Sequence, residues 1–206
     1  GADGGWLDAG EVEEVLAAIS VTVPRAAVVA DEDGAVTAAS ALGGPVAVKV
    51  VSGNGVHKSD LDGVLLGVEG KQAVRSAFRH VRTALPDAPV LIQEMVPGGH
   101  EVFIGMTEDP TFGPLLVYGL GGVTVELFGD VAFRLHPLTD VDAEEMVSQI
   151  RGARLLTGYR NLPPGDVGAV KDLLLRISAL VGGVPEIVEM DVNPVKVFAD
   201  GIRPID

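Results

Sequence analysis

The hydrophobic residues in the first half of the chain recur at two spacings, which predict helices alternating with strands. Some stretches place an apolar residue at every third or fourth position, and short continuous apolar runs lie between them. Asp8 and Glu11 have the spacing of a capping box, so we expect the first helix to begin there and to include Ile19. The other expected helices are 33–42 and 71–84, and the expected extended segments are 21–30, 46–51, 65–68 and 90–95.

The second half has a different pattern, in which strand-like runs follow one another across short turns of Gly, Asp and Pro. This pattern predicts an antiparallel sheet. Asp166 is placed to cap a helix whose apolar stripe reaches Val181, and Gly182-Gly183 is expected to end it. The expected strands are 101–106, 114–119 and 131–135, a further helix is expected at 142–156, and 186–193 with 195–198 are expected to form a hairpin-like pair.

The two patterns meet at Pro97-Gly98-Gly99, which breaks the chain between two expected strands. We therefore predict two lobes, residues 1–95 and residues 96–206. The first is expected to be a mixed α/β lobe and the second an α+β lobe with an antiparallel sheet. The polar, glycine-bearing stretch 52–63 predicts a mobile loop.

Composition narrows the choice of ligands and partners. The 206 residues include 15 basic and 29 acidic side chains, for a net charge of −14. Such a charge repels nucleic acid and anionic membranes, so neither is expected as a partner, and an anionic ligand needs a local cationic cluster. The chain has no cysteine, which excludes disulfides, thiol catalysis and zinc–thiolate sites. Its apolar runs are shorter than the ~20 residues of a membrane helix, and no signal peptide is evident, so a cytoplasmic location is expected.

Lys49 stands at the end of the valine-rich run 46–51. A buried ammonium group is costly unless an anion pairs with it, so a phosphate ligand is one interpretation. The other is a lysine at a strand end that extends its side chain into water. His57 follows in the loop with Lys58-Ser59-Asp60, and its imidazole could accept a phosphoryl group. A solvated loop histidine is the alternative.

The segment Glu94-Met95-Val96 ends an expected strand just before the break. Backbone groups at such a break are free to bind the edge of a flat base. Glu101 lies beyond the turn and could accept hydrogen bonds from ribose hydroxyls. From the residues alone, an ordinary strand–turn–strand with two solvated glutamates explains the same pattern.

Glu189, Asp191 and Asn193 alternate along an expected strand, so their side chains share one face. Magnesium prefers hard oxygen ligands and takes few of them from protein when phosphates and water complete its shell. Without a cation, three neighbouring acceptors on an apolar strand would repel one another or stay unsatisfied. The pattern therefore predicts a magnesium site. A glycine cluster is followed by Glu126, Asp130 and Arg134, which could reach a phosphate or a metal, although their spacing does not establish this.

Taken in order, these motifs resemble the ATP-grasp domain of NDP-forming acyl-CoA synthetases, the acetate–CoA ligase (ADP-forming) type. In such enzymes this domain is the β subunit or the β portion of a fused chain. The resemblance implies an ATP-grasp fold in which two α+β lobes, with mixed or antiparallel sheets, clamp a nucleotide. It is carried by Pro45–Val50, His57–Asp60, Gly63–Val68, Gln93–Val96, Phe112-Gly113-Pro114, Gly119–Gly122 and Glu189–Pro194.

The resemblance also implies roles for particular residues. Lys49 would contact the phosphates of ATP or ADP, Glu94, Met95 and Val96 would form the adenine hinge, and Glu101 would hold ribose. Asp191 and Asn193 would ligate Mg²⁺ with Glu189 as a helper. His57 would match a histidine that shuttles phosphoryl in some members. The implied reaction is acyl-CoA + ADP + phosphate ⇌ carboxylate + CoA + ATP.

Two departures from the family pattern lie in the loop of His57. Gly53-Asn54-Gly55 replaces a proline-containing segment, and Asp62 stands where a second glycine is common. The CoA-binding and ligase domains of the family are expected elsewhere in a longer chain or on a partner subunit. Two alternatives stay open: a regulatory module fused to an N-acetyltransferase domain, and a different ATP-grasp carboxylate ligase.

Overall fold

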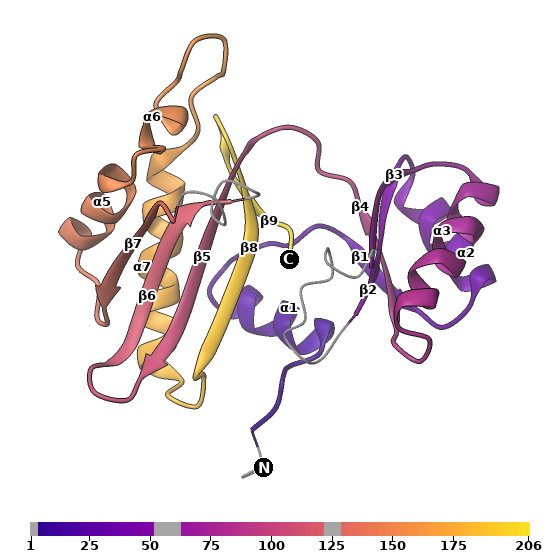
Figure 1. Ribbon diagram of the computed structural model, residues 1–206, viewed down its shortest axis with the longest axis horizontal. Helices are drawn as coiled ribbons and strands as arrows, with labels where there is room; N and C mark the ends of the chain where they lie inside the picture. Colours follow the sequence, from indigo (N-terminus) through magenta and orange to yellow (C-terminus); the bar gives the residue numbers. More distant parts are fainter. Residues whose placement is uncertain (1–3, 52–62, 122–128) are drawn as a thin grey trace. The chain divides into compact units, whose positions relative to one another are not determined.

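The computed structural model describes residues 4–51, 63–121 and 129–206. The chain forms two compact units, each built around one sheet (Figure 1). Unit 1 takes Gly1–Val15 and Pro24–Val96, and unit 2 takes Leu16–Val23 and Pro97–Asp206. Every pairing between named strands is antiparallel, in a four-stranded sheet of order β1-β4-β2-β3 and a five-stranded sheet of order β7-β6-β5-β8-β9.

Unit 1 buries one face of its sheet beneath two helices (Figure 1). Alternate residues of the two strands, Val46, Val48 and Val50 of β2 and Val90 and Ile92 of β4, pack against apolar residues of α2 and α3. This arrangement follows from the period of two along a strand. Ion pairs between Glu32 and Arg79 tie the two helices together on the outside and lower the pKa of Glu32. The elements are β1 Ala26–Val29, α2 Glu32–Leu42, β2 Val46–Val50, β3 Val64–Val68, α3 Lys71–Ala84 and β4 Val90–Glu94.

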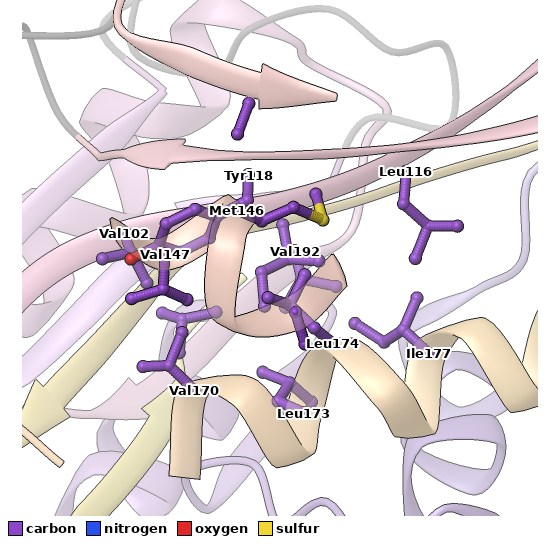
Figure 2. Packing of buried hydrophobic residues seen from close by; sticks show 14 of the residues in the cluster. Val102, Leu116, Tyr118, Met146, Val147, Val170, Leu173, Leu174, Ile177 and Val192 are labelled. Atoms are coloured by element: carbon purple, nitrogen blue, oxygen red, sulfur yellow. The ribbon is translucent and has the colours of Figure 1, made fainter. Parts of the chain in front are cut away.

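Unit 2 packs α5 and α7 against one face of its longer sheet. Tyr118 of β6, Met146 of α5 and Leu174 of α7 are fully buried and meet in this core (Figure 2). The opposite face of the sheet carries polar residues that include Glu101 of β5 and Glu189, Asp191 and Asn193 of β8. The elements are β5 His100–Asp109, β6 Gly113–Leu120, β7 Val131–Leu135, α5 Asp140–Gln149, α6 Ala153–Leu156, α7 Val167–Gly183, β8 Glu189–Phe198 and β9 Gly201–Pro204.

Helix starts follow the local capping signals. The capping box before α1 (Ala9–Ala18) is confirmed, since the Asp8 N–H donates to Glu11 and the Glu11 N–H donates back to Asp8. The cap of α7 is confirmed too, because the Asp166 carboxylate accepts from the Ala169 N–H at 2.9 Å. No helix of the described residues is long and apolar enough to cross a membrane.

The single helix expected at 142–156 was wrong, because the structure has two helices there. Ile150 adopts an extended backbone between α5 and α6. The two oxygens of the Asp130 carboxylate accept the N–H groups of Arg151 and Gly152, both at 2.8 Å. These bonds hold the chain in a new direction at that point.

The hairpin expected from 186–193 and 195–198 was also wrong. β8 is one continuous strand from Glu189 to Phe198, and its hairpin partner is β9. The strand stays paired with β5 across Asn193-Pro194 because the register shifts there: Val192 pairs with Ile104, and Val195 pairs with Val102. Two residues of β8 therefore stand opposite one residue of β5, which is a β-bulge.

Candidate functional site

The outer face of the unit 2 sheet, the face away from its helices, carries the predicted magnesium ligands. Glu189, Asp191 and Asn193 of β8 are exposed, whereas Val192 between them is only 4% exposed. The three side chains therefore lie on one face, as alternation along a strand requires. The Asn193 N–H donates to the carbonyl of Asp206, which fixes the backbone beside the amide side chain.

The donor set on this face fits a magnesium ion that takes few protein ligands. Asp191 and Asn193 offer hard oxygens, one of them charged. Gly105 of β5 pairs with Asp191 and adds no side chain to the face at that point. Among the residues that the structure describes, no group of three or more His, Cys, Asp or Glu side chains could hold a metal. Magnesium bound by few protein ligands typically completes its shell with phosphate and water oxygens.

Lys196 joins the same face and was missed by the sequence reasoning. Its ammonium lies 3.4 Å from the Glu101 carboxylate and donates to the Gly98 carbonyl at 3.0 Å. Only 18% of its side chain is exposed. The pair places a cation beside the predicted ribose ligand and ties both to the turn that precedes β5. Strict alternation from Asn193 would have turned Lys196 to the opposite face, and the β-bulge reverses this.

A signal for Lys196 was present in the sequence. Before Pro194, the apolar residues of β8 are Met190 and Val192, at even positions. After it, Val195 and Val197 stand at odd positions, and Phe198 ends the strand. This change of phase marks the bulge, because the core face must stay apolar on both sides of it.

Lys49 of β2 lies on the other face of the unit 1 sheet from Val46, Val48 and Val50, which belong to the core. It pairs in register with Leu91 of β4. Only 4% of the residue is exposed, so a lysine extended into water does not describe it. Burial keeps the position of its ammonium well defined, and this suits a group that must neutralise a phosphate.

The predicted adenine hinge stands at the end of β4. The Glu94 side chain accepts from Arg25 Nε at 2.7 Å, so the fold of unit 1 already uses this carboxylate. The N–H groups of Glu94 and Met95 donate to Arg25 and Pro45. Since proline has no N–H, Pro45 cannot donate back to the Met95 carbonyl. Backbone groups such as this carbonyl and the N–H of Val96 are therefore the candidates for binding the edge of a base.

The remaining candidates divide into two groups. His57, Glu126 and the expected mobile loop, except Gly63, lie outside the described residues. Asp130 and Arg134 have structural partners: Asp130 accepts from the backbone before α6, and Arg134 pairs with Glu145 of α5 at 2.9 Å. Glu101, Lys196 and the β8 oxygens thus gather in unit 2, while Lys49 and the hinge belong to unit 1.

The whole chain, residues 1–206, matches the family model described as an ATP-grasp domain. It is 43% identical over 210 residues to acetate–CoA ligase [ADP-forming] I of Archaeoglobus fulgidus, covering 98% of this chain and 30% of that protein. It is 37% identical over 203 residues to the β subunit of acetate–CoA ligase [ADP-forming] I of Pyrococcus furiosus, covering 95% of this chain and 88% of the subunit.

Solved structures show the same likeness. The dinucleotide-forming acetyl-coenzyme A synthetase 1 of Candidatus Korarchaeum cryptofilum, in complex with coenzyme A, Ca-AMPCP and HgCl⁺, superposes with a TM-score of 0.88 at 39% identity. The match covers 96% of this chain and 89% of that one. A second structure of that enzyme holds coenzyme A and Mg-AMPPCP, with its phosphohistidine segment pointing towards the nucleotide-binding site. Its TM-score is 0.82 at 38% identity, over 98% of this chain and 90% of that one.

Proposed function

This chain belongs to the family of ATP-grasp domains, and on that premise we propose that it is the nucleotide-binding domain of an ADP-forming acyl-CoA synthetase. The observation that carries the proposal is the outer face of the unit 2 sheet. There a carboxylate and an amide oxygen stand on β8, and the Glu101–Lys196 pair lies on the same face. The relatives named as ADP-forming ligases, and the solved relatives that hold ATP analogues with Mg or Ca, support this interpretation.

The proposed reaction is acyl-CoA + ADP + phosphate ⇌ carboxylate + CoA + ATP. In the phosphoryl step a histidine nitrogen forms a bond to the terminal phosphorus of ATP while the bond from that phosphorus to the ADP oxygen breaks. Such a transfer needs positioning and neutralisation of charge more than covalent help from the protein. Because the chain carries a net charge of −14, groups close to the phosphates must supply both the positioning and the positive charge.

Each candidate residue has a part in that task. Lys49 binds the phosphates by charge. Asp191 and Asn193 bind Mg²⁺, and Glu189, two residues before Asp191 on the same strand, helps them. When bound, the ion neutralises phosphate charge. Glu101 accepts from the ribose hydroxyls, and the Lys196 ammonium, 3.4 Å from the Glu101 carboxylate, holds that carboxylate in place.

The adenine contact falls to the backbone of Glu94, Met95 and Val96. The side chain of Glu94 is held by Arg25, so its carboxylate supports the hinge and does not read the base. We therefore expect nucleotide affinity to fall less when a side chain of the hinge is changed than when a backbone N–H of the hinge is removed.

His57 is proposed as a phosphoryl carrier on the strength of the family resemblance alone. Mass spectrometry of the full-length protein incubated with ATP should detect acid-labile phosphate, and His57→Ala should remove the part carried at residue 57. Phosphate on no histidine would favour the regulatory alternative.

Residues 1–95 and 96–206 are proposed to act as the two lobes of the nucleotide clamp. The compact units differ from this division in two respects, since Leu16–Val23 belongs to unit 2 and Val96 belongs to unit 1. The partners proposed are the CoA-binding and ligase domains, on the same chain or on a second subunit. The chain spans only 30% of the A. fulgidus ligase but 88% of the P. furiosus β subunit, so relatives of both kinds occur. A fusion to an N-acetyltransferase domain stays a prediction.

Calorimetry of the full-length protein with ADP, in the presence and absence of Mg²⁺, tests the nucleotide site. We expect binding that strengthens when Mg²⁺ is present. Absence of binding at millimolar ADP in both conditions would end the proposal.

A further inference from the structure

The loop between α6 and α7, residues 157–165, projects beyond α6 at the end of unit 2 (Figure 1). Its outermost residues form a tight turn in which the Leu162 N–H donates to the Tyr159 carbonyl at 3.0 Å. The two residues also pair as an isolated antiparallel bridge. Residues directly opposite in such a bridge present their side chains on the same side, so Tyr159 and Leu162 form a small apolar surface.

The base of the loop is held firmly by the fold. The Gly165 N–H donates to Leu156, the Asp166 N–H donates to Phe198, and Nε2 of His100 lies 2.7 Å from the Pro163 carbonyl. A Cβ at Gly165 would lie 2.8 Å from Val197, so the chain is pressed against β8 there. A turn anchored in this way loses little conformational entropy when a partner binds it.

Two exposed residues of the turn, Tyr159 and Arg160, are of types that are enriched at interface hot spots. Tyr159 is 43% exposed and Leu162 is 49% exposed. The Arg160 guanidinium lies over the Tyr159 ring, 5.2 Å from its centre. Arg160 also has a positive φ of 55°, which is unfavourable for a residue with a side chain and persists where the surrounding structure holds it. Tyr and Arg are among the residues most enriched where binding energy concentrates.

From this geometry we propose that Tyr159, Arg160 and Leu162, the docking tip, are where the CoA-binding and ligase portion of the synthetase binds this domain. The inference rests on the proposed function. The occupant follows from length: the chain covers 30% of the A. fulgidus ligase, so most of such an enzyme lies outside these residues. The loop that carries the tip is anchored at Pro163 by His100, which precedes Glu101 in the sequence. A partner bound at the tip therefore stands at the Glu101 end of the unit 2 sheet. The complementary surface is an apolar pocket with a carboxylate or carbonyl for Arg160.

A photo-cross-linking amino acid tests the contact in the full-length enzyme. p-Benzoylphenylalanine replaces Tyr159, and in a matched control it replaces Val141, which is 66% exposed on α5 of the same unit. We expect cross-linked peptides that join position 159 to the CoA-binding or ligase portion, and none from position 141. Cross-links to a second copy of this domain, equal cross-linking from both positions, or no cross-link would each overturn the proposal.

A second measurement separates docking from nucleotide binding. The double variant Arg160→Ser with Leu162→Ser should lower acyl-CoA-dependent ATP formation about tenfold while the dissociation constant for ADP changes less than about twofold. Val141→Ser should change neither. Loss of ADP affinity in the double variant would contradict a docking role. If the protein with p-benzoylphenylalanine at position 159 cross-links as expected but the wild-type enzyme binds no ADP, the proposed function is contradicted and the docking tip stands.

Discussion

Replacing Lys49 with methionine should weaken the binding of the nucleotide's phosphates and leave the binding of its adenosine portion unchanged. Methionine keeps the length and apolar character of the stem in a residue that is 4% exposed, and it removes only the charge. An ammonium about 4 Å from one phosphate charge gains about 4 kcal/mol at an effective dielectric constant of about 20. Part of this gain offsets the hydration that the lysine and the phosphate lose. A net loss of about 2 to 3 kcal/mol, or about 30- to 150-fold in affinity, is therefore expected.

Calorimetry with two ligands separates a phosphate contact from a general effect on the fold. ADP in Mg²⁺ should bind about 30- to 150-fold more weakly to the Lys49→Met protein, whereas adenosine, which has no phosphate, should bind as it does to the wild type. Lys71→Met, an exposed lysine in the first turn of α3, serves as the control and should change neither. Equal losses for ADP and adenosine would refute the reasoning, because a phosphate ligand cannot act on adenosine.

Three further perturbations test the metal site, the core and a helix cap. Asp191→Ala should abolish the dependence of ADP affinity on Mg²⁺, measured by calorimetry with and without the ion, because the charged oxygen ligand is lost. Gly152→Ala should lower the free energy of unfolding by about 1 to 3 kcal/mol in urea titrations, because its Cβ would lie 2.1 Å from Leu120 Cδ1 in a well-packed region. Hydrogen bonds from Thr139 lower the pKa of Asp142 below its ordinary 3.8, so its stabilising contribution is full above that pH and is lost as the pH falls through the lowered pKa. Asp142→Asn should therefore lower the midpoint of thermal unfolding at pH 7 and flatten its fall in acid.

Each of these perturbations has a matched control. Asp200→Ala changes another exposed aspartate, in the turn after β8, and should leave the Mg²⁺ dependence intact. Gly183→Ala meets nothing within 4 Å and should change stability by less than about 0.5 kcal/mol. Asp140→Asn lies in the same helical turn as Asp142 and should keep the acid profile of the wild type. Unchanged Mg²⁺ dependence in Asp191→Ala, a stable Gly152→Ala protein, or an unaltered acid profile in Asp142→Asn would contradict the respective assignment.

The features that the sequence predicted well depend on residues close together along the chain. The cap formed by Asp8 and Glu11 joins residues three positions apart, and so does the cap from Asp166 to Ala169. The alternation of Glu189, Asp191 and Asn193 about Val192 is likewise local, because it needs only the period of a strand. For this reason the helix starts and the shared face of the candidate metal ligands follow from the residue pattern alone.

Contacts between distant parts of the chain decided the rest. Asp130 ends the helix that the pattern continued to 156, and it does so from 21 residues away in sequence. Arg25 binds the Glu94 side chain from 69 residues away in sequence, so the fold of unit 1 already uses this carboxylate of the hinge. Pairing with β5 carries β8 through Pro194 with a bulge, and this turns Lys196 to the face of Asn193. By itself, then, the sequence determined where most elements begin and which side chains alternate, because nearest-neighbour hydrogen bonds and strand period are local properties. Only the tertiary structure decided which partners those side chains meet, because a strand's register and a carboxylate's distant partner depend on residues that no local pattern brings together.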